Sequence, residues 1–386
     1  MNVPKLRFKE FNDEWSYQSL SKYVNRITTK NKNNESNLVL TISAQYGLVD
    51  QTNFFNRSVS SSNLTGYYLL NNGDFAYNKS YSNGYPWGAV KRLNKYNQGV
   101  VSSLYICFKP NYLINSDFLE QYFETNKWYQ QISEVSVEGA RNHGLLNIAV
   151  NDFFNTKHYM PSIKEQEKIS NFLSLLDKKI ELQTKKIEDL KLFKTCTRNE
   201  LFKNFDYKCK LKDILIKWNK KNKDNEINYV ESISNKYGFV SQSDQFESRK
   251  VASKDLKNYY IIEKNVFGYN PSRLNVGSLA LKIDDKISVV SPLYECFTTT
   301  QNKKFLLEWF NSKYFQKETI SKFEGGVRNT LNFSNLCDIE IGLPSMSNQK
   351  KYDEVFTAFD TKINLEKNKL NKLIELKRGL MQNMFV

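Results

Sequence analysis

The octapeptide Ile42-Ser43-Ala44-Gln45-Tyr46-Gly47-Leu48-Val49 returns 191 positions later as Ile233-Ser234-Asn235-Lys236-Tyr237-Gly238-Phe239-Val240. Further segments repeat in the same order and at nearly the same spacing, among them Val100 to Phe108, which returns as Val289 to Phe297. A period of about 190 residues is too long for a solenoid repeat and fits a whole domain. The chain is therefore a tandem duplication, and a molecule with two similar halves suits a target with two similar parts.

Each repeat begins with a segment rich in Tyr, Phe, Asn, Ser and Gly, in which short β-branched runs alternate with turn clusters such as Asn71 to Asp74. This composition predicts a mixed, strand-rich domain with a few helices. Cys107 and Cys296 occupy equivalent places in apolar runs, so we expect both in the core. The five cysteines include no C-x-x-C pair, which argues against a zinc site and a disulfide framework.

A long segment rich in Lys, Glu and Leu follows each mixed domain, and the first of them contains no Gly or Pro from Ser162 to Phe205. In the first repeat Ser162 comes directly after Pro161, with Glu165 three residues further on, which is the pattern of a capping box at a helix start. Apolar residues then recur with a period of 3.5, as in coiled coils, and the same seam returns 183 positions later. The predicted seam residues are Leu173, Leu176, Ile180, Ile187 and Leu190 in the first helix and Phe356, Phe359, Ile363, Leu370 and Leu373 in the second.

An amphipathic helix packed on its own domain produces a similar stripe. The two seams match even in their polar interruptions, however, because Gln183 and Lys194 return as Glu366 and Lys377. This match favours pairing of the helices with each other, antiparallel if a twofold axis relates the repeats. We therefore predict an α+β fold: two mixed, strand-rich domains joined by two long antiparallel coiled-coil helices, with a pseudo-twofold internal duplication. The predicted segments are 1–159 for the first domain, 160–205 for the central helix, 206–342 for the second domain and 343–386 for the distal helix.

The charge balance points toward a polyanionic partner, since 56 basic residues against 41 acidic ones leave a net charge of +15. A Lys-rich surface without a special role gives the same balance, so charge alone leaves both interpretations open. The chain has no apolar run as long as a transmembrane helix, and its first residues lack the apolar region of a signal peptide. We expect a cytoplasmic protein with no membrane partner.

The motifs of common catalytic sites are missing from the sequence. There is no phosphate-binding P-loop, no dinucleotide-binding glycine motif and no Asp/Asn-Pro-Pro-aromatic run to hold a flipped base. His143 and His158 are the only histidines, which leaves little for a metal cluster or a His-based triad. Asp284-Asp285 is more simply explained as a solvated turn than as a pair of catalytic carboxylates. We expect no catalytic residue, no metal site and no cofactor.

Two loops carry cations and aromatic residues suited to nucleic-acid contacts. One extends from Lys79 to Arg92 and the other from Tyr269 to Ser278, and matching strands precede both. A shared framework with divergent loops is what two readers of different base sequences need, whereas a surface loop with its aromatics packed beneath it is the structural alternative. The expected DNA-binding residues are Lys79, Tyr81, Tyr85, Trp87, Lys91, Arg92 and Arg141 in the first repeat and Lys236, Tyr269, Arg273, Asn275 and Arg328 in the second.

Two of these residues, Arg141 and Arg328, belong to a second shared motif. Glu138-Gly139-Ala140-Arg141-Asn142 returns as Glu324-Gly325-Gly326-Val327-Arg328-Asn329. Its near-identity suits a common role, either a phosphate contact or a turn of the scaffold that closes the domain.

The doubled order of variable domain, Pro-Ser motif with a following Gln, and long helix resembles the specificity subunit of type I restriction–modification systems. The resemblance covers essentially the whole chain and rests on Glu138 to Asn147, Met160 to Gln166, Leu343 to Gln349 and the opening Pro4-Lys5-Leu6-Arg7-Phe8. It implies two target recognition domains, each reading one half of a bipartite, asymmetric site in double-stranded DNA. It also implies that the helices act as a spacer and dock two adenine-methyltransferase (M) subunits, while motor-endonuclease (R) subunits join for cleavage. One departure is Asn348, which replaces a Glu equivalent to Glu165.

Two other classes of protein remain open from the residues alone. The first is a self-sufficient restriction or modification enzyme, which would transfer methyl groups or cleave DNA without partners. The second is a coiled-coil assembly protein, which would show no affinity for DNA.

Overall fold

The computed structural model describes residues 2–55, 63–136, 146–203, 205, 207–235, 237–242, 255–320, 322 and 330–386. It has two compact units, which we call unit 1 (Met1–Gln183 with Lys369–Val386) and unit 2 (Thr184–Asn368). The boundaries between the units cut through both long helices, so each helix contributes one part to each unit.

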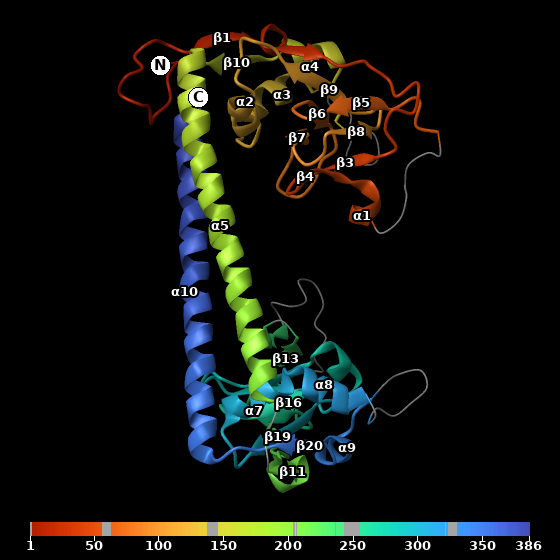
Figure 1. Ribbon diagram of the computed structural model, residues 1–386, viewed down its shortest axis with the longest axis vertical. Coiled ribbons are helices and arrows are strands. Elements are labelled where there is room, and N and C mark those ends of the chain that lie inside the picture. Colours follow the sequence, from red (N-terminus) through yellow and green to blue (C-terminus); the bar gives the residue numbers. More distant parts are fainter. Residues whose placement is uncertain are drawn as a thin grey trace. The chain divides into compact units, whose positions relative to one another are not determined.

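Unit 1 is built on a four-stranded antiparallel sheet with the order β2-β9-β6-β7 (Figure 1). Its strands are β2 (Val24–Arg26), β9 (Ile106–Pro110), β6 (Phe75–Asn78) and β7 (Ala89–Arg92). Three antiparallel strand pairs accompany it: β1 (Ser16–Ser19) with β10 (Lys157–Met160), β3 (Leu40–Ser43) with β4 (Gly47–Asp50), and β5 (Tyr68–Asn71) with β8 (Gln98–Val101). The short helices are η1 (Leu20–Lys22), α1 (Gln51–Phe55), α2 (Ser116–Phe123), α3 (Tyr129–Val135) and α4 (Val150–Asn155).

Unit 2 repeats the strand topology of unit 1. Its four-stranded sheet has the order β12-β19-β16-β17, formed by β12 (Leu215–Lys217), β19 (Glu295–Thr299), β16 (Phe267–Tyr269) and β17 (Leu279–Leu281). The accompanying pairs are β11 (Lys208–Lys210) with β20 (Glu340–Gly342), β13 (Glu231–Ser234) with β14 (Gly238–Ser241), and β15 (Tyr260–Ile262) with β18 (Ser288–Val290). The short helices are η2 (Leu211–Asp213), η3 (Pro271–Val276), α7 (Lys303–Phe310), α8 (Lys313–Ile320) and α9 (Phe333–Cys337).

The repeated sequence segments build the same aromatic core in each unit. Phe75 of β6 stacks on Phe108 of β9 with 5.3 Å between ring centroids, and Phe267 stacks on Phe297 at 5.0 Å in unit 2. All four side chains are fully buried, so each adds about 1.5–3 kcal/mol of apolar burial to folding. The strands that carry them also bury Cys107 and Cys296, and this confirms the predicted core position of these two residues.

The two long helices are α5 (Ile163–Leu201) and α10 (Met346–Met384), and they pair antiparallel within each unit. In unit 1, Leu173 of α5 and Met384 of α10 are buried in one apolar cluster. In unit 2, Ile187 and Ile363 are buried. The remaining predicted seam residues are buried or half-buried, which is what a 3.5-residue repeat requires of a coiled-coil interface. The predicted fold class is confirmed.

The start of α5 differs from the predicted capping box. Both carboxylate oxygens of Glu165 accept hydrogen bonds from Arg7, from Nε at 2.7 Å and from Nη2 at 2.8 Å. This bond raises the pKa of the Arg7 guanidinium, with the buried carboxylate as the main cause. Glu165 therefore fixes the N-terminal segment onto the helix. Asn348 stands at the equivalent position of α10, so unit 2 has no such ion pair.

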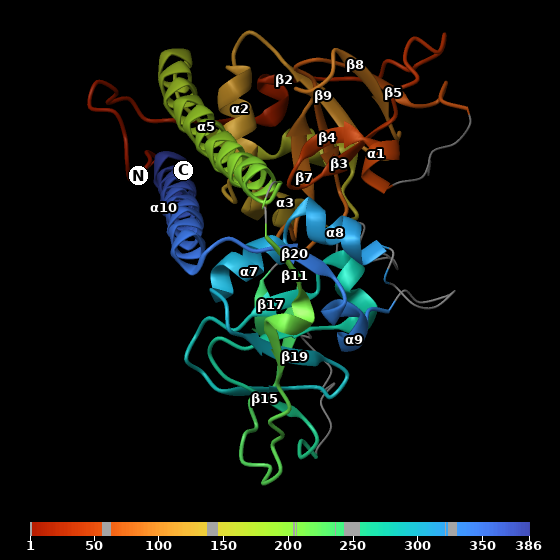
Figure 2. The ribbon, with the colours of Figure 1, turned by 60° about the horizontal axis from the view of Figure 1, so that its bottom comes forward.

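The glutamine of the Pro-Ser motif forms the same two backbone hydrogen bonds in both units. Gln166 Oε1 accepts from the backbone N–H of Asn115 at 2.8 Å, and its Nε2 donates to the carbonyl of Pro161 at 2.9 Å. Gln349 binds the N–H of Asn302 and the carbonyl of Pro344 at 3.0 and 2.9 Å. Since Asn115 and Asn302 cap α2 and α7, each buried glutamine ties the start of a long helix to the start of a domain helix. In Figure 1 and Figure 2 alike, α2 lies between the unit 1 sheet and α5.

Candidate nucleic-acid interface

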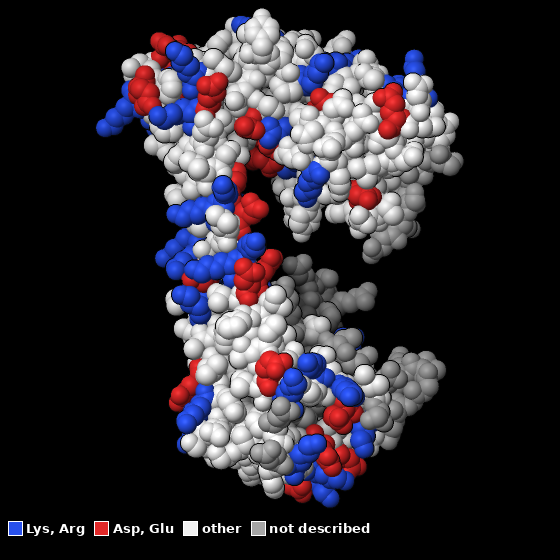
Figure 3. Space-filling view, in the orientation of Figure 1, with Lys and Arg blue, Asp and Glu red and all other residues white. Residues whose placement is uncertain are grey.

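Unit 1 contains a cleft of about 900 Å³ between its mixed domain and its part of the helix pair, which we call the unit 1 cleft. One wall consists of the β3–β4 turn, the end of β7 and the end of α2. The opposite wall consists of α5 around Asp177 and α10 from Ile374 to Gln382. Polar and charged side chains line both walls, and Figure 3 shows basic and acidic side chains gathered along the helix pair.

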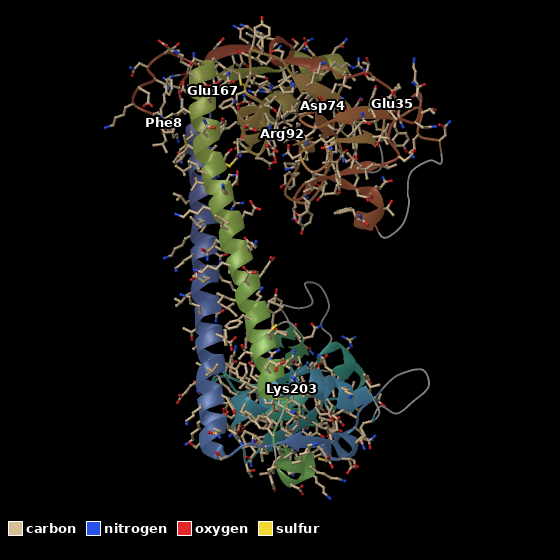
Figure 4. The ribbon with its side chains drawn as sticks, viewed as in Figure 1. Phe8, Glu35, Asp74, Arg92, Glu167 and Lys203 are labelled. Atoms are coloured by element: carbon tan, nitrogen blue, oxygen red, sulfur yellow. The ribbon has the colours of Figure 1, made fainter. Side chains whose placement is uncertain are left out.

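Several cations of the unit 1 cleft are neutralised by neighbouring carboxylates. Lys91 is buried, and its Nζ lies 2.5 Å from Glu124 Oε1. Arg92, labelled in Figure 4, contacts Asp117 at 2.7 Å and Glu120 at 2.6 Å. Burial nevertheless raises the pKa of Glu120. These two predicted DNA contacts therefore hold β7 against α2, and we do not carry them into the proposed interface.

Two other cations of the cleft expose their charge to solvent. Lys95 follows β7, and Arg378 lies on the facing side of α10. Neither has an ion-pair partner within the described ranges. An exposed, unneutralised cation on each wall is the arrangement expected of a channel for a polyanion.

The rest of the predicted loop of unit 1 divides into structural and exposed residues. Lys79 Nζ donates to the carbonyl of Ile148 at 3.1 Å, which closes the loop on the segment before α4. Trp87 packs on the core, and its carbonyl accepts from Tyr77 Oη at 2.8 Å. Tyr85 is half-buried and lines the cleft, where burial raises its pKa. Tyr81 is exposed and remains available for contact with a partner.

In unit 2, the predicted residues also separate by burial. Tyr269 is fully buried in the core beside Phe297, so its ring offers no surface to DNA. Its burial raises the pKa of its hydroxyl, which has no hydrogen-bond partner among the described residues. Arg273 is exposed on η3, a helix that Asn270 caps. Arg141, Lys236, Arg328 and the side chain of Asn275 lie outside the described residues, as do the shared motifs at 138–142 and 324–329.

The residues that sequence reasoning missed are two exposed tyrosines at the tips of equivalent hairpins. Tyr46 lies in the β3–β4 turn and Tyr237 in the β13–β14 turn, with 61% and 70% of their surface exposed. Both tyrosines belong to the repeated Ile-Ser-x-x-Tyr-Gly pattern, which indicates a duplication and by itself does not indicate that the rings are exposed. The sequence gives no comparable indication of Lys95 and Arg378, because they line opposite walls of a cleft that forms only in the folded chain.

The described part of the chain contains no group of three or more His, Cys, Asp or Glu side chains placed to hold a metal ion. Nor does any helix in it have the length and apolar character needed to cross a membrane.

Comparisons with known proteins agree on one family. Residues 203–376 match the family model described as the type I restriction modification DNA specificity domain. A solved structure titled as the basis of complex assembly and conformational transition of the type I R-M system matches with a TM-score of 0.59 and 12% identity, covering 98% of this chain and 99% of that one. The type I S subunit from M. genitalium matches with a TM-score of 0.51 and 15% identity over 100% and 99% of the two chains. No curated protein matches in sequence.

Proposed function

We propose that this chain reads its DNA target in two parts. Through its domain at residues 203–376, the chain belongs to the DNA specificity subunits of type I restriction–modification systems. Each unit recognises one half of a bipartite site in double-stranded DNA, and the two halves differ in sequence. The mixed domains, which lie between β1 and β10 and between β11 and β20, act as the target recognition domains.

The observation that carries this proposal is a pair of frameworks that share one strand order and differ in their connections. Strands β6 and β7 pair antiparallel and are joined by residues 79–88, which make a tight turn at Ser82 and Tyr85. Strands β16 and β17 pair in the same way, yet η3 joins them. Since side chains on such connections determine groove contacts, one framework with two connections supports readout of two different half-sites.

The helix pair acts as the spacer between half-sites and docks two M subunits. In support, each unit has exposed apolar side chains at equivalent helix positions. Leu182 and Leu376 are exposed in unit 1, and Leu365 and Phe193, each 183 positions from one of them, are exposed in unit 2. Equivalent apolar surfaces suit two copies of one partner.

We assign the chemistry to the partners. M subunits transfer the methyl group, R subunits cleave, and this chain contributes recognition without catalysis. The similar solved structure concerns complex assembly of the type I R-M system, which supports M and R subunits as partners. We assign the complex to the cytoplasm, because the proposed target is double-stranded DNA.

Methylome sequencing tests this function. The chain co-expressed with M subunits is expected to direct methylation to a bipartite sequence with a spacer of constant length, whereas the chain alone with S-adenosylmethionine and DNA is expected to leave the DNA unmethylated. Methylation by the chain alone would show it to be an enzyme. Methylation of a continuous, undivided site would contradict the half-site model.

A matched insertion tests the spacer role. Seven residues inserted after Lys185 and seven after Asn368, positions 183 apart, keep the two seams in register. We expect a longer spacer with unchanged half-sites. The control is insertion after Lys185 alone, which offsets the seams and is expected to lower stability. An unchanged spacer in a folded double insertion would rule out the spacer role.

A further inference from the structure

The β3–β4 hairpin of unit 1 ends in a tight turn that holds one aromatic side chain in solvent. Ser43 pairs with Gly47, so residues 44–46 form the loop, and Gly47 has φ +80°, a left-handed conformation that favours glycine. The N–H of Tyr46 donates to Ser43 Oγ at 3.2 Å, which fixes the tip. Tyr46 is 61% exposed although the strands beneath it bury Leu40 and Leu48.

Unit 2 builds the same turn. Ser234 pairs with Gly238, whose φ is +71°, and the N–H of Tyr237 donates to Ser234 Oγ at 3.4 Å. The tyrosine is therefore common to both turns, while the two residues before it differ. They are Ala44-Gln45 in unit 1 and Asn235-Lys236 in unit 2. Tyrosine at both tips suits a contact with DNA that the two units share. The differing pair of residues before it suits a contact specific to each half-site.

The tip of unit 1 faces a channel suited to nucleic acid. Ala44, Gln45 and Tyr46 line the unit 1 cleft together with the exposed cations Lys95 and Arg378. A ring held in solvent by its own backbone adds little to folding, because most of its surface stays in water. Because an exposed ring recurs at the tip of both hairpins, we infer a role in binding.

We propose, on the basis of the function assigned above, that the β3–β4 tip is a second element of unit 1 that reads bases, in addition to the β6–β7 connection. Tyr46 packs against a base or sugar, and residues 44 and 45 determine which base is accepted. The Gln45 amide can pair with adenine through one donor and one acceptor, as Gln does in major grooves. Lys95 and Arg378 hold phosphates on the two walls, without regard to sequence.

The test uses the chain assembled with its M subunits and labelled duplexes that carry the methylated sequence or a changed first half-site. Tyr46→Ala is expected to lose about tenfold in affinity for the duplex with the intact half-site, the size of a lost stacking contact. Tyr112→Ala is the matched control, because Tyr112 is an 88% exposed tyrosine of unit 1 outside the cleft, and it is expected to change nothing. Thermal melting should be the same for both variants.

Two further variants separate base reading from phosphate binding. Replacing Ala44-Gln45 with Asn-Lys is expected to change the methylated sequence in the first half-site only. Lys95→Ala with Arg378→Ala is expected to weaken binding of every duplex alike and to flatten the salt dependence by about one unit per removed contact. If Tyr46→Ala keeps the original affinity and the Asn-Lys exchange keeps the original methylated sequence, the tip does not read bases, although the proposed function stands. If the unaltered complex shows no sequence preference, the proposed function fails and this inference fails with it.

Discussion

Lys377 of α10 lies 2.5 Å from Asp177 of α5 in unit 1, and the residues 183 positions away from them, Lys194 and Asp360, lie 2.8 Å apart in unit 2. The duplicated sequence thus builds the same ion pair twice, with the helix that supplies the lysine exchanged. An antiparallel pair of repeated helices requires this exchange. The polar interruptions of the seam therefore specify register, a role known for polar residues in coiled coils.

The two lysines are expected to differ in their effect on stability. Lys377 and Asp177 are partly exposed, so Lys377→Ala should cost less than about 1 kcal/mol. Lys194 also contacts the buried Glu308 at 2.7 Å. Lys194→Ala leaves that carboxylate with Arg198 as its charged partner and should cost about 1–3 kcal/mol. Urea unfolding of both variants measures the difference, and equal losses would contradict this reading of Glu308.

Unit 2 contains a buried ionic cluster that unit 1 replaces with apolar residues. Lys282 Nζ lies 2.6 Å from Glu231 Oε2, which also accepts from Ser288 Oγ at 2.5 Å. The side chain of Lys282 is 0% exposed. Lys282→Leu alone should destabilise the protein by about 3–5 kcal/mol, because it leaves Glu231 buried without its cation.

Unit 1 supplies the matched control for this cluster. Leu40, Leu93 and Gly99 occupy the equivalent positions, and Leu40 packs so closely on Gly99 that a Cβ there would lie 2.4 Å from its Cδ1. Introducing all three unit 1 residues into unit 2 (E231L, K282L and S288G) is expected to leave stability unchanged or raised. Thermal melting of the triple variant checks this, and a loss as large as that of Lys282→Leu would contradict it.

His158 should make stability depend on pH. Its ring nitrogens Nδ1 and Nε2 form hydrogen bonds of 2.8 Å with Tyr122 Oη and Thr156 Oγ1. Burial lowers the pKa of the His158 ring to about 3. The unfolded chain, with an ordinary histidine pKa of about 6.5, binds this proton first. Stability from this group is complete above about pH 6.5 and falls by up to about 1.4 kcal/mol per pH unit as pH drops toward 3.

The comparison of His158 with His158→Gln isolates this contribution from that of the carboxylates. Unfolding free energies measured from pH 7.5 to 4.5 should fall more steeply for the unaltered protein than for the variant. Parallel curves would show that His158 is not held neutral.

The helices and the repeat could be predicted because their signals are local. A 3.5-residue period places Leu173 and Ile363 on a seam wherever the partner lies. Residues of the candidate interface depend on the fold instead. Lys91 is buried in an ion pair with Glu124, which lies 33 positions further along the chain. The sequence predicts Tyr269 in a loop, whereas the pairing of β16 with β19 places it in the sheet. Composition and local sequence patterns do not predict such long-range contacts.

The most direct test of the central claim exchanges one recognition domain for the other. Residues 208–342 are replaced with residues 16–160, since both pieces begin and end with paired strands, β11 with β20 and β1 with β10. The chain then carries two copies of the unit 1 reader on antiparallel helices. Methylome sequencing with M subunits should find a palindromic site, made of the first half-site and its inverted copy. An asymmetric site that retains the second half-site, from a folded and assembled complex, would contradict the account.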